Sequence, residues 1–158
     1  MKIGFGYDSH RFSFDRPLIL GGVRISDNNG LEGHSDGDAL SHAITDAVLG
    51  AASAQDIGHH FPSSSSQWKD CDSIVLLQES VELVGRLGLK IGNIDATIVC
   101  ESPRLSQFRQ AIIESLVAAL KIEPQQVSIK SKTNDKMGWI GSRLGLAVYA
   151  ITLLEPVE

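Results

Sequence analysis

The fold is decided by the stretch His34-Ser-Asp-Gly-Asp-Ala-Leu-Ser-His42-Ala-Ile-Thr-Asp46. Apolar residues recur here at helical spacing, which predicts a helix over residues 38–53 with one face on a core. Asp38, His42 and Asp46 are four residues apart, so they share the opposite face. The Ser35-x-x-Asp38 spacing is typical of a capping box at the helix start. The apolar face comprises Leu40, Ala43, Ile44, Ala47, Val48 and Ala51.

The polar face of this helix allows two interpretations. It is either a solvated surface, as on most amphipathic helices, or part of a site in which an imidazole lies between two carboxylates. The stretch alone leaves both interpretations open. Side chains brought from other segments must decide between them.

Length and composition indicate a single globular domain over residues 1–158. A hydrophobic content of 42% and a charged content of 21% are ordinary for soluble proteins, and a net charge of −5 argues against a nucleic-acid partner. Cys71 and Cys100 form no CxxC pattern, which predicts reduced thiols in a cytoplasmic protein. We expect no signal peptide and no membrane association, because no apolar run reaches transmembrane length.

Working outward from the helix, the periodicity predicts an α+β fold. The simplest arrangement is ferredoxin-like, a mainly four-stranded mixed sheet with helices packed on one face. Gly4 and Gly6 in the first strand permit close approach of another backbone. The expected strands are residues 2–12, 91–100, 127–132 and 144–154, with a hairpin at 18–25, further helices at 72–87 and 106–120, and loops at 26–37, 56–70 and 133–143.

Asp8 and His10 are the first candidates for a site. Residues i and i+2 of a strand share a face, so a carboxylate and an imidazole lie side by side. They are either a hydrogen-bonded polar pair or two metal ligands that need a third from elsewhere, for which His42 is the best candidate. An Asp/His/His set with one open position is typical of catalytic zinc. Asp46 would either orient His42 or be solvated.

Two further clusters carry groups that suit phosphate. His34 and Ser35 precede the predicted helix, whose free N–H groups favour an anion. Residues 130–139 combine hydroxyls, cations and a carboxylate, which suits phosphate oxygens and Mg²⁺. Taken alone, each cluster is more commonly an ordinary polar loop. We assign no role to His59-His60, because adjacent residues rarely converge on one ion.

Together these clusters closely resemble the 2-C-methyl-D-erythritol 2,4-cyclodiphosphate synthase family. The resemblance covers essentially the whole chain, and the order and spacing of its motifs are highly specific. The matching motifs are Gly4-Phe-Gly-Tyr-Asp8-Ser-His10-Arg-Phe12, Leu20-Gly-Gly-Val23, His34-Ser-Asp-Gly-Asp38, His42-Ala-x-x-Asp46-Ala-x-Leu-Gly-Ala51, Asp56-Ile-Gly58 with Phe61-Pro62, and Thr133 to Gly138.

The resemblance implies an enzyme of non-mevalonate isoprenoid precursor biosynthesis. It would convert 4-diphosphocytidyl-2-C-methyl-D-erythritol 2-phosphate to the cyclic diphosphate and CMP, as the 2-phosphate attacks the β-phosphorus. It would be a homotrimer with active sites between subunits. Asp8, His10 and His42 would hold one Zn²⁺ per subunit, and Mg²⁺ or Mn²⁺ would bind the substrate diphosphate.

The resemblance also implies roles for individual side chains. His34 and Thr133 would stabilise the transition state. Residues 56–58 would face the methylerythritol unit, and residues 100–106 and 131–133 would form a cytidine pocket for a neighbouring subunit. The full set of expected substrate contacts is Asp8, His10, His34, Ser35, Asp56, Ile57, Gly58, Phe61, Ser63, Ser65, Cys100, Pro103, Arg104, Leu105, Lys132, Thr133, Asn134, Asp135, Trp139 and Arg143.

The chain departs from the family pattern at several positions. Ser63 replaces the usual aspartate, Asp135 replaces a glutamate, and Arg104 replaces a lysine. The family signature Gly-Arg-Gly-Glu-Gly reads Gly141-Ser-Arg-Leu-Gly145 here, so its arginine and glutamate positions hold Ser142 and Leu144. Arg143, one residue away, is kept as an anion contact.

Two other functions fit the same residues. One is a zinc-dependent phosphoester hydrolase, which would need a water at the open zinc position. The other is a non-catalytic trimer that binds a metal or an isoprenoid. The products of turnover separate the three, because only the cyclising enzyme releases CMP together with a cyclic diphosphate.

Overall fold

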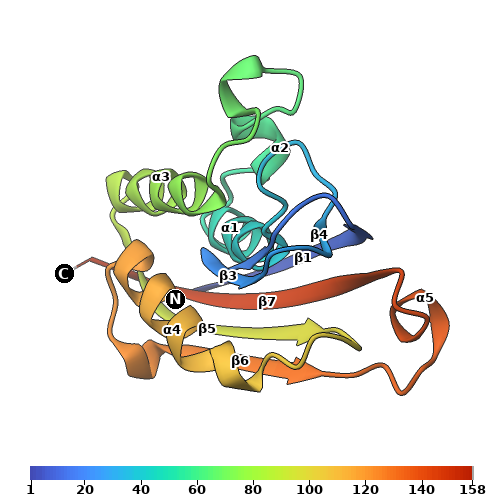
Figure 1. Cartoon of the computed structure of the whole chain (residues 1–158). Coiled ribbons are helices and arrows are strands. Elements are labelled where there is room, and N and C mark those ends of the chain that lie inside the picture. The colour runs from blue at the N-terminus through green and yellow to red at the C-terminus, as the bar shows by residue number, and fades with distance from the viewer. Residues whose placement is uncertain (158) are drawn as a thin grey trace.

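The chain is built on one mixed β-sheet (Figure 1). The computed structural model describes residues 1–157, and within them five strands pair in the order β4-β1-β7-β5-β6. The β5–β6 pair is parallel, and the other pairs are antiparallel. The strands are β1 (Lys2–Ser13), β4 (Gly30–Leu31), β5 (Leu89–Val99), β6 (Val127–Lys132) and β7 (Gly145–Pro156), and a separate hairpin joins β2 (Leu18–Leu20) and β3 (Val23–Ser26).

The predicted α+β class and four long strands are confirmed. The prediction of a continuous loop over residues 26–37 is wrong at Gly30–Leu31, where β4 adds a fifth strand to the sheet. Leu31 and Gly30 pair with Phe12 and Ser13 of β1. A strand of two residues is too short to show alternation, so the sequence pattern carries no signal for it.

The longer helices lie on one face of the sheet, as predicted (Figure 1). α1 packs on β1 and β7, while α4 packs on β6 and on α3. The helix predicted over residues 106–120 begins as a 3₁₀ turn, and both predicted loops 56–70 and 133–143 contain single helical turns, which are too short to show a period. The helices are α1 (Ala39–Ala51), α2 (Ile57–His60), α3 (Ser73–Arg86), α4 (Arg109–Leu120) and α5 (Gly138–Gly141), with 3₁₀ turns η1 (Ser66–Trp68), η2 (Ser106–Phe108) and η3 (Pro124–Gln126).

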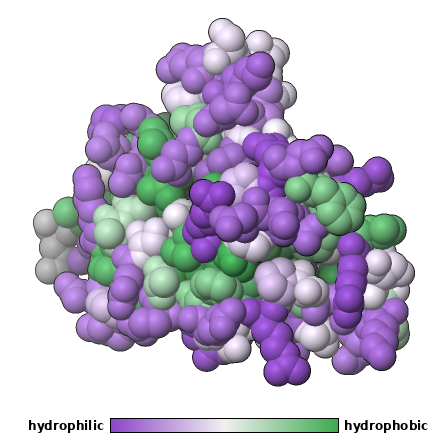
Figure 2. All heavy atoms as spheres, in the orientation of Figure 1, coloured by the Kyte–Doolittle hydropathy of each residue, from purple (hydrophilic) through white to green (hydrophobic). Residues whose placement is uncertain are grey.

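The core lies between these helices and the sheet. All six residues of the predicted apolar face of α1 are buried, together with Leu77, Ile98 and Leu116 from the other layers. Figure 2 shows hydrophobic residues gathered between α3 and α4, while hydrophilic residues cover the loop that projects beyond α2. No helix within residues 1–157 has the length and hydrophobicity needed to span a membrane.

β1 and α1 touch backbone to backbone. A Cβ atom added to Gly4 would lie 1.9 Å from the Ala47 carbonyl oxygen, and one added to Gly6 would lie 1.9 Å from the Ala43 oxygen. No side chain fits at either glycine, as the sequence predicts. The contact therefore presses the strand that carries Asp8 against the helix that carries His42.

Asp38 anchors the start of α1 from a fully buried position. Its carboxylate accepts hydrogen bonds from Gly21 N (2.9 Å), Gly22 N (2.7 Å) and both the N (3.0 Å) and the Oγ (2.8 Å) of Ser41. Burial raises the pKa of Asp38, and the hydrogen bonds from Ser41 and the two glycines oppose the rise. The predicted capping role of Ser35 is wrong, because Asp38 itself is the N-cap.

The other face of the sheet exposes apolar side chains. Alternation along β1 turns Ile3, Phe5 and Tyr7 to this face, with exposed fractions of 74%, 61% and 45%. Tyr149 and Ile151 of β7 lie directly opposite Tyr7 and Phe5, and the two tyrosine rings are 5.2 Å apart. An exposed apolar group of this kind typically marks an interaction surface. We call these five residues the outer sheet patch.

Replacing Gly6 with alanine should separate β1 from α1. The added Cβ meets backbone atoms that no rotamer change can move, so we expect Gly6→Ala to lower the free energy of unfolding by about 3 kcal/mol. Denaturant unfolding followed by circular dichroism measures the change.

Gly50→Ala is the matched control on α1. Its new Cβ would meet only the Phe5 carbonyl oxygen, at 3.9 Å, and alanine favours a helix over glycine by about 1 kcal/mol. We expect equal or greater stability for this variant. A Gly6→Ala protein as stable as Gly50→Ala would contradict the backbone contact.

Candidate active site

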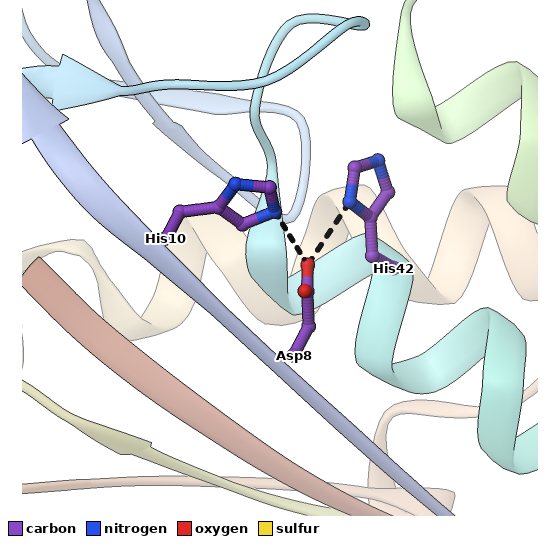
Figure 3. Close-up of side chains that lie close together, drawn as sticks. All are labelled: Asp8, His10 and His42. Carbon is purple, nitrogen blue, oxygen red and sulfur yellow. Dashed lines mark hydrogen bonds and ion pairs between the residues drawn. The ribbon is translucent and has the colours of Figure 1, made fainter. Parts of the chain in front are cut away.

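The three predicted metal ligands converge beside the contact of β1 with α1 (Figure 3). Asp8 and His10 extend from β1, and His42 extends from the second turn of α1. Asp8 Oδ2 lies 2.8 Å from His10 Nε2 and 3.0 Å from His42 Nδ1. One ligand atom of each residue lies within 4.8 Å of the other two. Strand alternation and helical spacing thus bring together the residues that the sequence singles out.

The electrostatics of this cluster suit a cation. Burial alone would raise the pKa of Asp8, but hydrogen bonds from His10 and His42 outweigh it and hold that pKa well below its usual value. Burial lowers the pKa of His10, and the Asp8 carboxylate more than reverses this, so the net shift is upward. The cluster therefore favours positive charge between the carboxylate and the rings.

The hydrogen bond on the far side of His10 shows that a metal ion fits. His10 Nδ1 faces the backbone carbonyl of Glu32, which can only accept, so Nδ1 carries the proton. In neutral His10, Nε2 then turns a lone pair toward the Asp8 carboxylate. Two electron pairs that face one another need a proton or a metal ion between them. A carboxylate and two imidazoles, from Asp8, His10 and His42, are donors of the type that a divalent metal ion such as zinc accepts.

The other ring nitrogen of His42 points to two serines. His42 Nε2 lies 2.8 Å from Ser73 Oγ and 3.1 Å from Ser35 Oγ. The prediction that Asp46 orients His42 is wrong, because both ring nitrogens face other side chains and Asp46 is half-buried beside them. Asp46 Oδ1 instead accepts a hydrogen bond of 2.8 Å from Ile57 N, which ties α2 to α1.

A cavity of about 250 Å³ opens over the three ligands. It gathers most of the residues predicted to face the phosphates and the methylerythritol unit. Arg16 holds its rim by donating to the carbonyls of Gly33 and Ser35. The Asp38 carboxylate already occupies the start of α1 and accepts from Ser41 N, so the anion site predicted there depends mainly on His34 and Ser35. The cavity is lined by Asp8, His10, His34, Ser35, His42, Ile57, Gly58, Phe61, Ser63, Trp68 and Leu76.

A second cavity, of about 120 Å³, gathers most of the residues predicted for cytidine. It lies where β5 and β6 end side by side, because the two strands run parallel. Burial raises the pKa of the Cys100 thiol to about 11, so this side chain lines the cavity as an uncharged group at physiological pH. The lining residues are Cys100, Glu101, Pro103, Arg104, Leu105, Ser106, Ser131, Lys132 and Thr133.

Glu101 holds the loop that follows Thr133. Its Oε1 accepts hydrogen bonds from Asn134 N (2.8 Å) and Lys136 N (3.1 Å). Thr133 Oγ1 lies 3.4 Å from the Asp135 carboxylate, so the hydroxyl and the acid predicted to act on the phosphates are neighbours.

The remaining predicted contacts are spread out. Trp139 shares a cavity with His10, and Arg143 lines another with Phe12 and Pro103. Arg143 has a φ of 60°, the left-handed conformation that favours glycine. Four predicted contacts line none of these cavities: Asp56, Ser65, Asn134 and Asp135.

Comparison with known proteins gives the family. A model of the YgbB family matches residues 1–155. The chain belongs to the YgbB family. Curated relatives include the 2-C-methyl-D-erythritol 2,4-cyclodiphosphate synthases of Synechococcus sp. strain JA-2-3B'a(2-13), 49% identical with 98% of each chain covered, and of Thermosynechococcus vestitus, 48% identical with 98% of this chain and 96% of the relative covered.

Solved structures of YgbB-like proteins share the fold. IspF of Plasmodium falciparum in a CDP complex superposes with a TM-score of 0.88 at 35% identity, covering 99% of this chain and 97% of the other. The bifunctional IspDF of Campylobacter jejuni gives a TM-score of 0.96 at 37% identity, with 99% of this chain but 42% of that larger protein covered. The family resemblance read from the sequence is therefore confirmed.

Several residues of this YgbB-family site escape prediction from sequence. Trp68 and Leu76 line the metal cavity, and Ser73 contacts His42. Ser73 begins a helix, where serine is usual for capping, so nothing in the pattern marks it as part of a site. Glu101 lies within the predicted cytidine range, but its hold on residues 134–136 depends on tertiary contacts.

Asp46→Ala should loosen α2. The variant removes the acceptor of the Ile57 amide, a bond worth about 1 kcal/mol, so we expect hydrogen exchange at that amide to quicken about fivefold. Asp46→Asn keeps a carbonyl acceptor and should retain most of the protection. Equal exchange rates in wild type and Asp46→Ala would remove Asp46 from this role.

Proposed function

We propose that this chain converts 4-diphosphocytidyl-2-C-methyl-D-erythritol 2-phosphate to 2-C-methyl-D-erythritol 2,4-cyclodiphosphate and CMP. The observation that carries the proposal is the Asp8, His10 and His42 cluster, which lies open in a cavity of a chain that matches the synthases over almost its whole length. In this reaction a 2-phosphate oxygen forms a bond to the β-phosphorus. The bond from that phosphorus to the oxygen of CMP breaks, so the ring closes as CMP leaves.

The metal we propose at the cluster is one Zn²⁺ per subunit. Two imidazoles and one carboxylate with an open fourth position suit catalytic zinc. Bound there, zinc would supply Lewis-acid polarisation of a phosphate oxygen. Mg²⁺ or Mn²⁺ would accompany the substrate diphosphate, whose charge it would neutralise.

The chain's own contribution is positioning and charge, because phosphoryl transfer needs no protein nucleophile. His34 and Ser35 line the metal cavity and would bind phosphate oxygens. Ile57 and Gly58 line the same cavity and would hold the methylerythritol carbons. Thr133 would stabilise charge on the diphosphate from the second cavity.

The second cavity supports a cytidine site. The neutral Cys100 thiol in its lining suits the cytosine ring, and the cations Arg104 and Lys132 suit a phosphate group. The Plasmodium falciparum relative was solved in a CDP complex, and we extend that ligand class to this chain.

We propose a homotrimer in which this cavity serves the metal site of a neighbouring subunit. The metal ligands and the cytidine residues line separate cavities of one chain, which supports completion by a second copy. The outer sheet patch offers the apolar surface that such an assembly would bury. We place the enzyme in the cytoplasm, where Cys71 and Cys100 stay reduced, with no nucleic-acid partner.

Turnover of the cytidine substrate tests the function. ³¹P NMR should show the cyclic diphosphate and CMP in equal amounts, and a zinc chelator should stop both. Release of inorganic phosphate would instead indicate a hydrolase. Zinc binding without CMP release would indicate a non-catalytic binding protein.

His42→Ala should abolish turnover and lower the zinc content from one ion per chain toward zero. The loss of one of three ligands leaves too few donors to compete with water. Metal analysis after dialysis gives the stoichiometry. His59→Ala, which removes an exposed histidine from the nearby α2, should retain zinc. Unchanged zinc in His42→Ala would refute the ligand set.

Thr133→Val should keep zinc and slow turnover by about 100-fold, as expected when one hydrogen-bond donor to a transition state is removed. Valine has the shape of threonine without the hydroxyl. Thr133→Ser restores the hydroxyl and should regain most of the rate constant. Full activity in Thr133→Val would remove Thr133 from the mechanism.

A further inference from the structure

We infer that Ser73 and Asp36 form a hydrogen-bond relay that fixes the tautomer of His42 and so aims its Nδ1 lone pair at the metal position. The inference deepens the proposed function, since it rests on the metal site assigned there. Ser73 and Asp36 are positioning residues, because they act on the metal position through His42.

The relay is continuous, and its middle member is buried while its two ends are half-buried. Ser73 Oγ lies 2.8 Å from His42 Nε2 and donates a hydrogen bond of 2.5 Å to Asp36 Oδ1. Ser73 is fully buried, and its side chain joins the start of α3 to the second turn of α1. Asp36 lies in the loop before α1, so three separate segments supply the three members.

The orientation of the Asp36 carboxylate is fixed on both oxygens. Oδ2 accepts from Ser73 N at 3.0 Å, while Oδ1 accepts from Ser73 Oγ and from Asp38 N at 3.1 Å. A carboxylate with both oxygens engaged cannot turn away from the serine. The Ser73 hydroxyl therefore keeps its hydrogen bond to the Asp36 carboxylate.

Counting protons then gives the tautomer. A serine hydroxyl has one proton and two lone pairs. Ser73 gives its proton to Asp36, so it can only accept from His42. His42 Nε2 must then carry the ring proton, and in neutral His42 the Nδ1 atom turns a lone pair toward Asp8, which is 3.0 Å away.

Without the relay, Asp8 would reverse this arrangement. Its carboxylate is the strongest acceptor beside the ring, so it would draw the proton of neutral His42 onto Nδ1 and close the metal position. Metal-bound histidines commonly donate their second N–H to an oxygen acceptor, and losing that partner lowers metal affinity about 10-fold to 100-fold. Ser73 supplies that acceptor here, and Asp36 strengthens it.

The test measures tautomer and zinc affinity in Ser73→Ala and Asp36→Asn. At a pH where the His42 ring is neutral, ¹⁵N NMR of the metal-free protein should show His42 protonated on Nε2 in wild type and shifted toward Nδ1 in both variants. Competition with a chromophoric chelator should show zinc affinity lowered about 10-fold to 100-fold in Ser73→Ala. Ser35 remains 3.1 Å from His42 Nε2, so the double variant Ser35→Ala/Ser73→Ala should lose at least as much affinity.

Ser80→Ala is the matched control. Ser80 is a buried serine on the same helix whose hydroxyl donates to Leu76 O, so its loss should leave both readouts unchanged. Thermal unfolding of each variant reports any general loss of structure. An Nε2–H tautomer that persists in Ser73→Ala, or zinc affinity equal to wild type, overturns the relay. Wild type that binds no zinc refutes the metal site instead, and the NMR comparison still tests the relay.

Discussion

The contact between the backbones of β1 and α1 is the constraint on which the rest of the structure depends. Gly4 and Gly6 leave no space for a side chain, and Ala43 and Ala47 present a flat helix surface to them. A helix held so close to a strand brings short side chains from both elements within ligand distance of one another. The Asp8 carboxylate can therefore reach His42 without any loop in between. The positions of Asp8 and His42 are therefore fixed by the packing of β1 on α1.

Patterns that are local in the sequence predict much of the fold and of the candidate site. Strand alternation pairs Asp8 with His10, and helical spacing sets His42 apart from its apolar neighbours, so the sequence predicts the cluster that the structure brings together. The four long strands and longer helices follow from the same periodicities. Element ends differ by only a few residues, as expected for boundaries that depend on caps.

The failures share a different cause. β4, α2 and α5 are too short to repeat a pattern, so periodicity cannot show them. The partner of Asp46 was misjudged because Ile57 approaches it only after α2 folds back on α1. Ser73 belongs to a helix far along the chain from His42 and looks like an ordinary helix-start serine. Such roles come from tertiary contacts, which single-sequence patterns do not encode.

The alternation of β1 has a consequence for how this chain can evolve. One face of the strand carries the glycines, Asp8 and His10, and the other carries Ile3, Phe5 and Tyr7 of the outer sheet patch. Inserting or deleting one residue early in β1 would exchange the two sets for part of the strand. Aromatic rings would then meet α1, and glycines would face outward. A length change in β1 should therefore disturb this chain far more than a length change in the loops around α2.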